Sequence, residues 1–227
     1  MVPLLVLGTF LTFILLDWLL NRNKVVQPVK IAAAAAPARA LAPRVEPEHV
    51  DGFLVPEKLA YHPGHTWLAR ERRNLVRVGA DEFAACLAGA VDKVELPKPG
   101  QWIRQGQKTW SFFRDGQKTE MVSPTEGEIV EVNQELVKDP SLLRRDPYGL
   151  GWVAMVHVPD EESTNRNLVP AGLVRNWMRD AVSRLYALQP QVAGVVAADG
   201  GRPADDLLAG IPDTNWKEVT GEFFLTA

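Results

Sequence analysis

The stretch TWSFFRDGQKTEMVSP, residues 109–124, contains two strand-like arms on either side of an Asp115-Gly116 pair. An Asp-Gly pair between such arms predicts a tight β-hairpin, because both central residues of the favoured turn have positive φ angles. A two-residue loop then places Phe113 opposite Lys118. Lys118 is therefore expected within a strand and not at the apex of the hairpin.

Side chains alternate between the two faces of a strand, which divides the aromatic residues of the first arm. Trp110 and Phe112 fall on one face, for which packing in the core is expected. Phe113 falls on the other face, beside the turn. We interpret Phe113, Arg114 and Asp115 as candidate contact residues for a partner.

Short strands separated by turns continue on both sides of this hairpin, from residue 53 to residue 160. Residues 66–80 predict a second hairpin, with a polar turn at residues 72–74. Residues 81–89 predict a short helix that begins at Asp81 as N-cap and ends at Gly89. The segments 90–96, 123–133 and 152–159 add further strands. The pattern indicates a mainly β domain, a sandwich or a small barrel.

The N-terminal segment is the part of the chain that composition sets apart. Residues 2–20 are almost wholly apolar, with Asp17 as the single charge, and a bilayer is crossed by about 20 helical residues. We predict a transmembrane anchor over residues 1–22, with a buried helix as the alternative. Lys and Arg follow the segment and do not precede it, which predicts a single-pass protein of the inner (cytoplasmic) membrane whose domain faces the cytoplasm.

Two further regions complete the expected organisation of the chain. Residues 23–52 are rich in Ala and Pro and predict a tether. Residues 161–227 predict a C-terminal extension, in which residues 169–188 form an amphipathic helix. Its apolar stripe either packs on the domain or faces a partner or a membrane, and Trp177 on it is a fourth candidate contact residue. Residues 204–211 predict a short helix, and residues 215–227 a terminal strand or docking tail.

Composition argues against several classes of function. A net charge of −3 gives no basic face for nucleic acid. Cys86, the single cysteine, is expected to pack as a small buried residue. His62 and His65 flank a Pro-Gly turn, which favours a structural or surface role over metal ligation. No catalytic residues and no metal ligands are predicted, so the chain is not expected to be an enzyme.

Four segments resemble the glycine cleavage system H protein family in order and spacing. They are YHPGHTWL (61–68), VGADEFAACLAGAVDKVELPKPG (78–100), SPTEGEIVEVN (123–133) and DPYGLGWVAMV (146–156). The resemblance implies a barrel-sandwich hybrid with a short internal helix and a C-terminal helix. The apolar composition of residues 2–20 adds the predicted N-terminal transmembrane helix to this fold. The resemblance also implies a lysine at a hairpin tip that carries lipoate through an amide bond.

The position of that lysine departs from the family pattern. The match runs without a gap between residues 95 and 124, and the family's lysine falls on Gly116, with its preceding acidic residue on Phe113. We therefore expect a membrane-tethered domain without lipoate that acts as a protein-binding adaptor or assembly component, with partners that the sequence does not name. The alternative is a lipoyl carrier for glycine cleavage or a related redox transfer, modified on Lys118.

Overall fold

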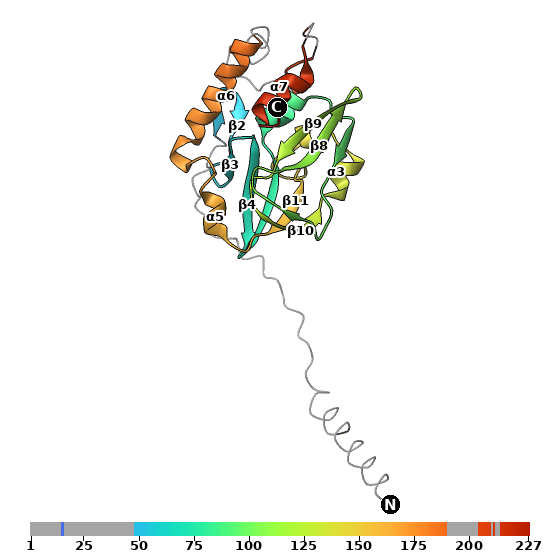
Figure 1. Cartoon of the computed structure of the whole chain (residues 1–227), viewed down its shortest axis with the longest axis vertical. Coiled ribbons are helices and arrows are strands. Elements are labelled where there is room, and N and C mark those ends of the chain that lie inside the picture. The colour runs from blue at the N-terminus through green and yellow to red at the C-terminus, as the bar shows by residue number, and fades with distance from the viewer. Residues whose placement is uncertain (1–14, 16–47, 190–203, 210, 212–213) are drawn as a thin grey trace, which may run out of the picture. The chain divides into compact units, whose positions relative to one another are not determined.

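Antiparallel sheets form the body of the folded part of the chain (Figure 1). The structure, a computed structural model, describes residues 15, 48–189, 204–209, 211 and 214–227. A six-stranded sheet has the order β3-β4-β5-β11-β10-β7, a three-stranded sheet the order β6-β8-β9, and β1 pairs with β2. The predicted mainly β fold is confirmed.

The strands are short, as the spacing of turn residues predicts. Their bounds are β1 His49–Val50, β2 Phe53–Leu54, β3 Ala60–His62, β4 Thr66–Arg72, β5 Leu75–Ala80, β6 Lys93–Glu95, β7 Trp102–Ile103, β8 Lys108–Arg114, β9 Gln117–Val122, β10 Gly127–Val132 and β11 Ala154–His157. The helices are α2 Glu82–Ala88, α3 Gln134–Lys138, α4 Leu142–Arg145, α5 Glu161–Asn165, α6 Val174–Leu188 and α7 Trp216–Phe223, with a 3-10 turn at Ala171–Leu173.

Helix α2 has the ends that its sequence predicts. The carboxylate of Asp81 accepts a hydrogen bond from the amide of Ala84, which satisfies one free N–H of the first turn. Gly89 ends the helix with a φ of 71°, a conformation that glycine adopts without a steric penalty. Every residue of α2 is buried, so this helix forms part of the core.

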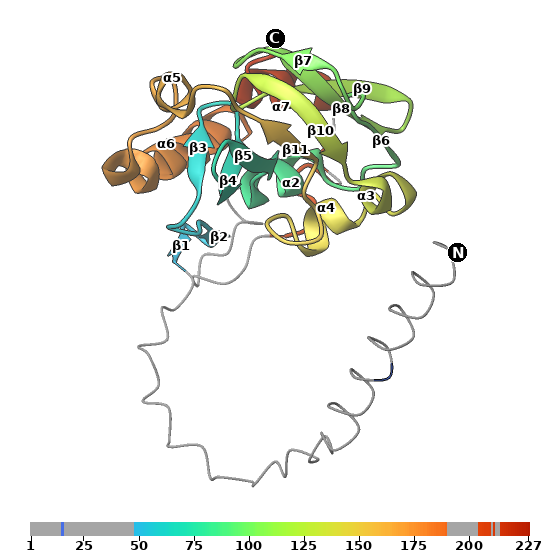
Figure 2. The same cartoon turned by 90° about the horizontal axis from the view of Figure 1, so that it is seen from below.

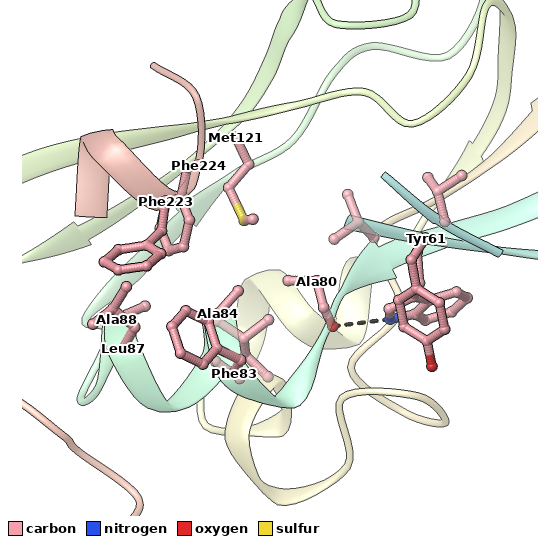
Figure 3. Packing of buried hydrophobic residues seen from close by; sticks show 14 of the residues in the cluster. Tyr61, Ala80, Phe83, Ala84, Leu87, Ala88, Met121, Phe223 and Phe224 are labelled. Carbon is pink, nitrogen blue, oxygen red and sulfur yellow. Dashed lines mark hydrogen bonds between the residues drawn. The ribbon is translucent and has the colours of Figure 1, made fainter. Parts of the chain in front are cut away.

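Large aromatic side chains fill the space between the sheets and the helices. Trp67, Phe83, Trp110, Phe112 and Phe223 are each less than 2 % exposed. Figure 3 shows residues of α2 facing Met121 of β9 and the phenylalanines at the end of α7. The C-terminal end of the chain therefore contributes to the same core as the hairpin and α2.

Helix α6 lies beside β3, away from α3 and α4 (Figures 1 and 2). It begins at Val174, later than the predicted residue 169, because Pro170 precedes a 3-10 turn. Its apolar stripe is buried, which favours packing on the domain over a stripe that faces a partner or a membrane. The buried residues are Val174, Met178, Ala181, Val182 and Leu185.

Several boundaries differ from the predictions. The strand β1 lies within the range predicted as a tether, because residues 49–54 pair as a short two-stranded ladder. Residues 204–209 form a turn and not a helix. Residues 215–227 contain the helix α7 and no strand, since Asn215 caps a helix through the amide of Glu218.

The predicted membrane anchor lies outside the described residues, apart from Leu15, and so does most of the predicted tether. Among the residues that the structure describes, no helix is long and apolar enough to cross a membrane.

Candidate functional site

The hairpin of β8 and β9 has the turn and the register that its sequence predicts. Asp115 and Gly116 have φ angles of 50° and 74°, so both central residues of the turn are in the left-handed region. Arg114 pairs with Gln117, and Phe113 pairs with Lys118. The apex of the hairpin is therefore Asp115-Gly116.

The aromatic residues of β8 divide between the core and the surface. Trp110 and Phe112 are buried, as predicted. Phe113 is partly exposed on the other face, and the ammonium group of Lys93 lies 4.9 Å from the centre of its ring. Phe113 thus presents part of an aromatic surface beside the turn.

Gly116 occupies an open position at the apex of the hairpin. The residue is exposed, and a Cβ atom built on it would have no neighbouring atom within 4 Å. A long side chain at this position would extend directly into solvent. The position is therefore sterically open to a lysine, although its positive φ disfavours any residue with a side chain.

Lys118 lies in the ladder of β9, two residues beyond the apex. Its side chain is 46 % exposed, and its Nζ atom lies 3.1 Å from Oε1 of Glu120. An ion pair this exposed stabilises a protein by at most about 1 kcal/mol, so the amine remains accessible to solvent. A hollow of about 560 Å³ opens beside Lys118, between β9 and α7.

Arg114 and Asp115 have different surroundings although they are neighbours. The side chain of Asp115 is 85 % exposed, and its amide donates a hydrogen bond of 2.8 Å to Oδ2 of Asp92. The guanidinium group of Arg114 faces the carboxylate of Asp206 instead of solvent. Asp115, and not Arg114, is thus the charged side chain that the tip presents.

Trp177, the fourth candidate contact residue, is placed in a separate cluster. Its ring stacks on His65, with 4.7 Å between the ring centres, and lies 5.9 Å from the ring of Tyr61. Phe83 stacks on His65 at 4.4 Å. His65 is therefore held between two aromatic rings, and Trp177 fixes α6 to the domain.

The buried histidines His62 and His65 contact groups within the domain, which is consistent with a structural role. Nδ1 of His65 lies 2.9 Å from Oδ2 of Asp81, and its Nε2 atom has no hydrogen-bond partner among the described residues. Nδ1 of His62 accepts a hydrogen bond from the amide of Gly64. Burial and the neighbouring His65 lower the pKa of His62 to about 4. Cys86 is buried, as predicted.

Two residues that touch the hairpin have no signal in the sequence. Asp92 and Asp206 accept hydrogen bonds from the backbone or side chains at the tip. Asp206 is separated from Arg114 by 92 residues and follows Asp205 in an acidic pair, a pattern that is most often solvated. Only the folded chain shows that these carboxylates hold the hairpin.

The fold and the hairpin define a class of protein: a small antiparallel β-domain that presents a two-residue turn at one end. The sequence profile of the glycine cleavage H-protein family matches residues 59–181. The glycine cleavage system H protein of Mycobacterium leprae is 35% identical over 106 residues, which are 47% of this chain and 80% of that protein. The corresponding protein of Thermobifida fusca is 36% identical over 107 residues, 47% of this chain and 84% of that protein.

A solved structure is also similar to this chain. The crystal structure of a glycine cleavage system H protein from Mycobacterium marinum covers 46% of this chain and 87% of its own, with 30% sequence identity and a TM-score of 0.43. The family profile and the sequence relatives identify the chain, which belongs to the glycine cleavage H-protein family. The segments before residue 59 and after residue 181 lie outside the family match.

Proposed function

We propose that this chain is a membrane-tethered member of the H-protein family that carries no lipoate and acts as a protein-binding adaptor or assembly component. One observation carries the proposal. In the gapless match between residues 95 and 124, the family's lipoyl-lysine position falls on Gly116, and Gly116 is the second residue of the tight turn at the hairpin apex. The position that would hold the cofactor has no amine.

The amine of Lys118 does not lie at the hairpin apex, where the family carries its lysine. A carrier lysine at the apex projects its stem away from both strands, so that the bound group can reach the active sites of partner enzymes. Lys118 is directly opposite Phe113 in the ladder and is paired with Glu120. A ligase that recognises the apex of a hairpin would meet Gly116 and Asp115 there.

The second candidate function is a lipoyl carrier modified on Lys118. Its support is the exposure of this side chain and the open hollow beside it. In that case the protein would take part in glycine cleavage or in a related redox transfer, with the dithiolane supplied by the bound lipoate.

Intact-mass spectrometry separates the two functions. We expect the full-length chain, expressed with lipoate and a lipoate ligase, to have the mass of the unmodified protein. A mass gain of one lipoyl group that is lost in Lys118→Arg and kept in Lys138→Arg would establish the carrier instead. Lys138 is a suitable control because it is also exposed and also paired with a glutamate, away from the hairpin.

The membrane tether has its own support and its own test. The support is the apolar stretch of residues 2–20, followed by Arg22, Lys24 and Lys30. We expect the full-length chain to sediment with membranes and to need detergent for release, and a variant without residues 1–24 to be soluble. An unchanged distribution of the shortened variant would contradict the tether.

A further inference from the structure

The end of the chain packs against the hairpin although it lies outside the family match. We call residues 204–209, 211 and 214–227 the C-terminal cap. Its helix α7 contacts β9, which is the second strand of the hairpin, and α2. Figure 1 shows α7 beside β9. The cap therefore covers one side of the hairpin that gives the family its function.

Apolar contacts hold α7 in place. Phe223 and Phe224 are wholly buried, and the ring of Phe223 lies 5.2 Å from the ring of Phe83. Both phenylalanines point from α7 toward α2 and Met121 (Figure 3). The indole of Trp216 donates a hydrogen bond of 3.0 Å to the carbonyl of Ala88. Each large aromatic side chain removes about 150–250 Å² from water, so the cap is a stable part of the domain.

Polar contacts join the cap to both strands of the hairpin. Near the base of β8, Nζ of Lys108 donates to the carbonyl of Thr226 at 2.7 Å. In β9, the hydroxyl of Thr220 donates to the hydroxyl of Thr119 at 2.9 Å, and both groups are buried. These two contacts lie away from the apex.

The third polar contact is an ion pair at the apex itself. Nη1 of Arg114 donates to Oδ1 of Asp206 at 3.0 Å, and Nη2 lies 2.9 Å from Oδ2. The side chains are only 17% and 15% exposed. A two-point pair between a guanidinium and a carboxylate fixes orientation as well as distance. Because Arg114 directly precedes the turn, this pair fixes the direction in which the apex points.

The other side of the apex is also held. Oδ2 of Asp92 accepts the amide of Asp115, and the amide of Asp92 donates to the carbonyl of Phe113. The apex thus has contacts to the segment before β6 on one side and to the cap on the other. Surface loops are in general more mobile than the strands they connect, and contacts on both sides restrict this mobility at the apex.

We propose that the C-terminal cap is a strap that holds the hairpin apex in one position, with Arg114 and Asp206 as its positioning residues. The held apex presents Phe113, Asp115 and Gln117 as a preformed surface. A surface that is already ordered loses less conformational entropy when a partner binds. The strap is a property of the free chain; its use in partner binding rests on the adaptor function proposed above.

Hydrogen exchange of the full-length chain tests the strap. We expect Asp206→Ala to accelerate exchange of the amides of residues 113–118 about tenfold or more, while the amides of the β4–β5 hairpin keep their rates. Asp205→Ala is the matched control: this neighbouring carboxylate is 67% exposed and lies 3.6 Å from Arg144, not from the hairpin. Its exchange pattern should equal that of the wild type.

A double-mutant cycle distinguishes the ion pair from the other contacts of Asp206, which also accepts hydrogen bonds from the amides of Ala90 and Leu208. Arg114→Ala should also accelerate exchange at residues 113–118, and Arg114→Ala combined with Asp206→Ala should exchange no faster than the faster single variant. Unchanged exchange in Asp206→Ala would overturn the proposal, and so would an equal acceleration throughout the domain or fully additive effects of the two changes. Lipoate takes no part in this measurement, so its outcome is independent of the lipoylation test.

Discussion

Single residues differ in how far their sequence context determines their conformation. Asp115-Gly116 could be predicted as a tight turn, because the positive φ angles follow from a local pair of residues between two strands. The environment of His62 could not be predicted. Its burial and its hydrogen bond to the amide of Gly64 depend on where β3 packs in the folded chain.

At the scale of the residue, the low pKa of His62 predicts that the stability of the protein depends on pH. Protonation of Nδ1 would remove the acceptor of the Gly64 amide and place a charge in a buried site. The folded chain holds the pKa of His62 at about 4, below the usual value of 6.5, so the unfolded chain binds more protons between these pH values. The contribution of His62 to the free energy of unfolding should therefore be fully present above pH 6.5. It should be lost as the pH falls toward 4, which lowers the free energy of unfolding by up to about 3 kcal/mol.

Urea denaturation between pH 4 and pH 7 measures this dependence. His62→Gln keeps an acceptor but does not titrate, so its free energy of unfolding should depend less on pH than that of the wild type. His157→Gln changes an exposed histidine and should keep the wild-type slope. Parallel curves for the wild type and His62→Gln would show that His62 is not the group responsible.

At the scale of elements, local patterns predicted the hairpins and α2 better than the terminal segments. The register of β8 and β9 followed from one Asp-Gly pair, and the ends of α2 followed from Asp81 and Gly89. The helix α7 was missed although Asn215 and Glu218 have the spacing of a capping box. Short elements such as β1 and α5 carry too few residues for a periodic pattern.

At the scale of the element, the packing of α6 on the domain predicts how a substitution of Trp177 changes the stability of the protein. Trp177 stacks on His65, so Trp177→Ala removes the aromatic contact that joins α6 to the domain. We expect the free energy of unfolding to fall by about 2 kcal/mol, since the side chain is only partly buried. Leu188→Ala, on an exposed residue of the same helix, should change it by less than about 0.5 kcal/mol. Equal effects in a urea titration would contradict the stacking role.

At the scale of the whole molecule, the mainly β fold could be predicted, whereas the path of the C-terminal end could not. Strand spacing and the ordered family segments are local features that indicate the sheets. The contacts of Arg114 with Asp206 and of Thr119 with Thr220 join residues 92 and 101 positions apart. No periodicity within either segment indicates its distant partner, so these contacts become visible only in the folded chain.

The central claim is that this member of the H-protein family lacks lipoate because Gly116 occupies the position of the carrier lysine. Gly116→Lys tests it most directly, since a side chain at this position has open space around it. The left-handed backbone should lower the stability of the variant by about 1–2 kcal/mol. Thermal denaturation shows, before the assay, whether the variant is still folded at the assay temperature.

The decisive measurement is the intact mass of the wild type and of Gly116→Lys after expression with lipoate and a lipoate ligase. We predict that the wild type keeps its unmodified mass and that folded Gly116→Lys gains one lipoyl group. Lipoylation of the wild type would contradict this claim, and so would a folded Gly116→Lys that remains unmodified.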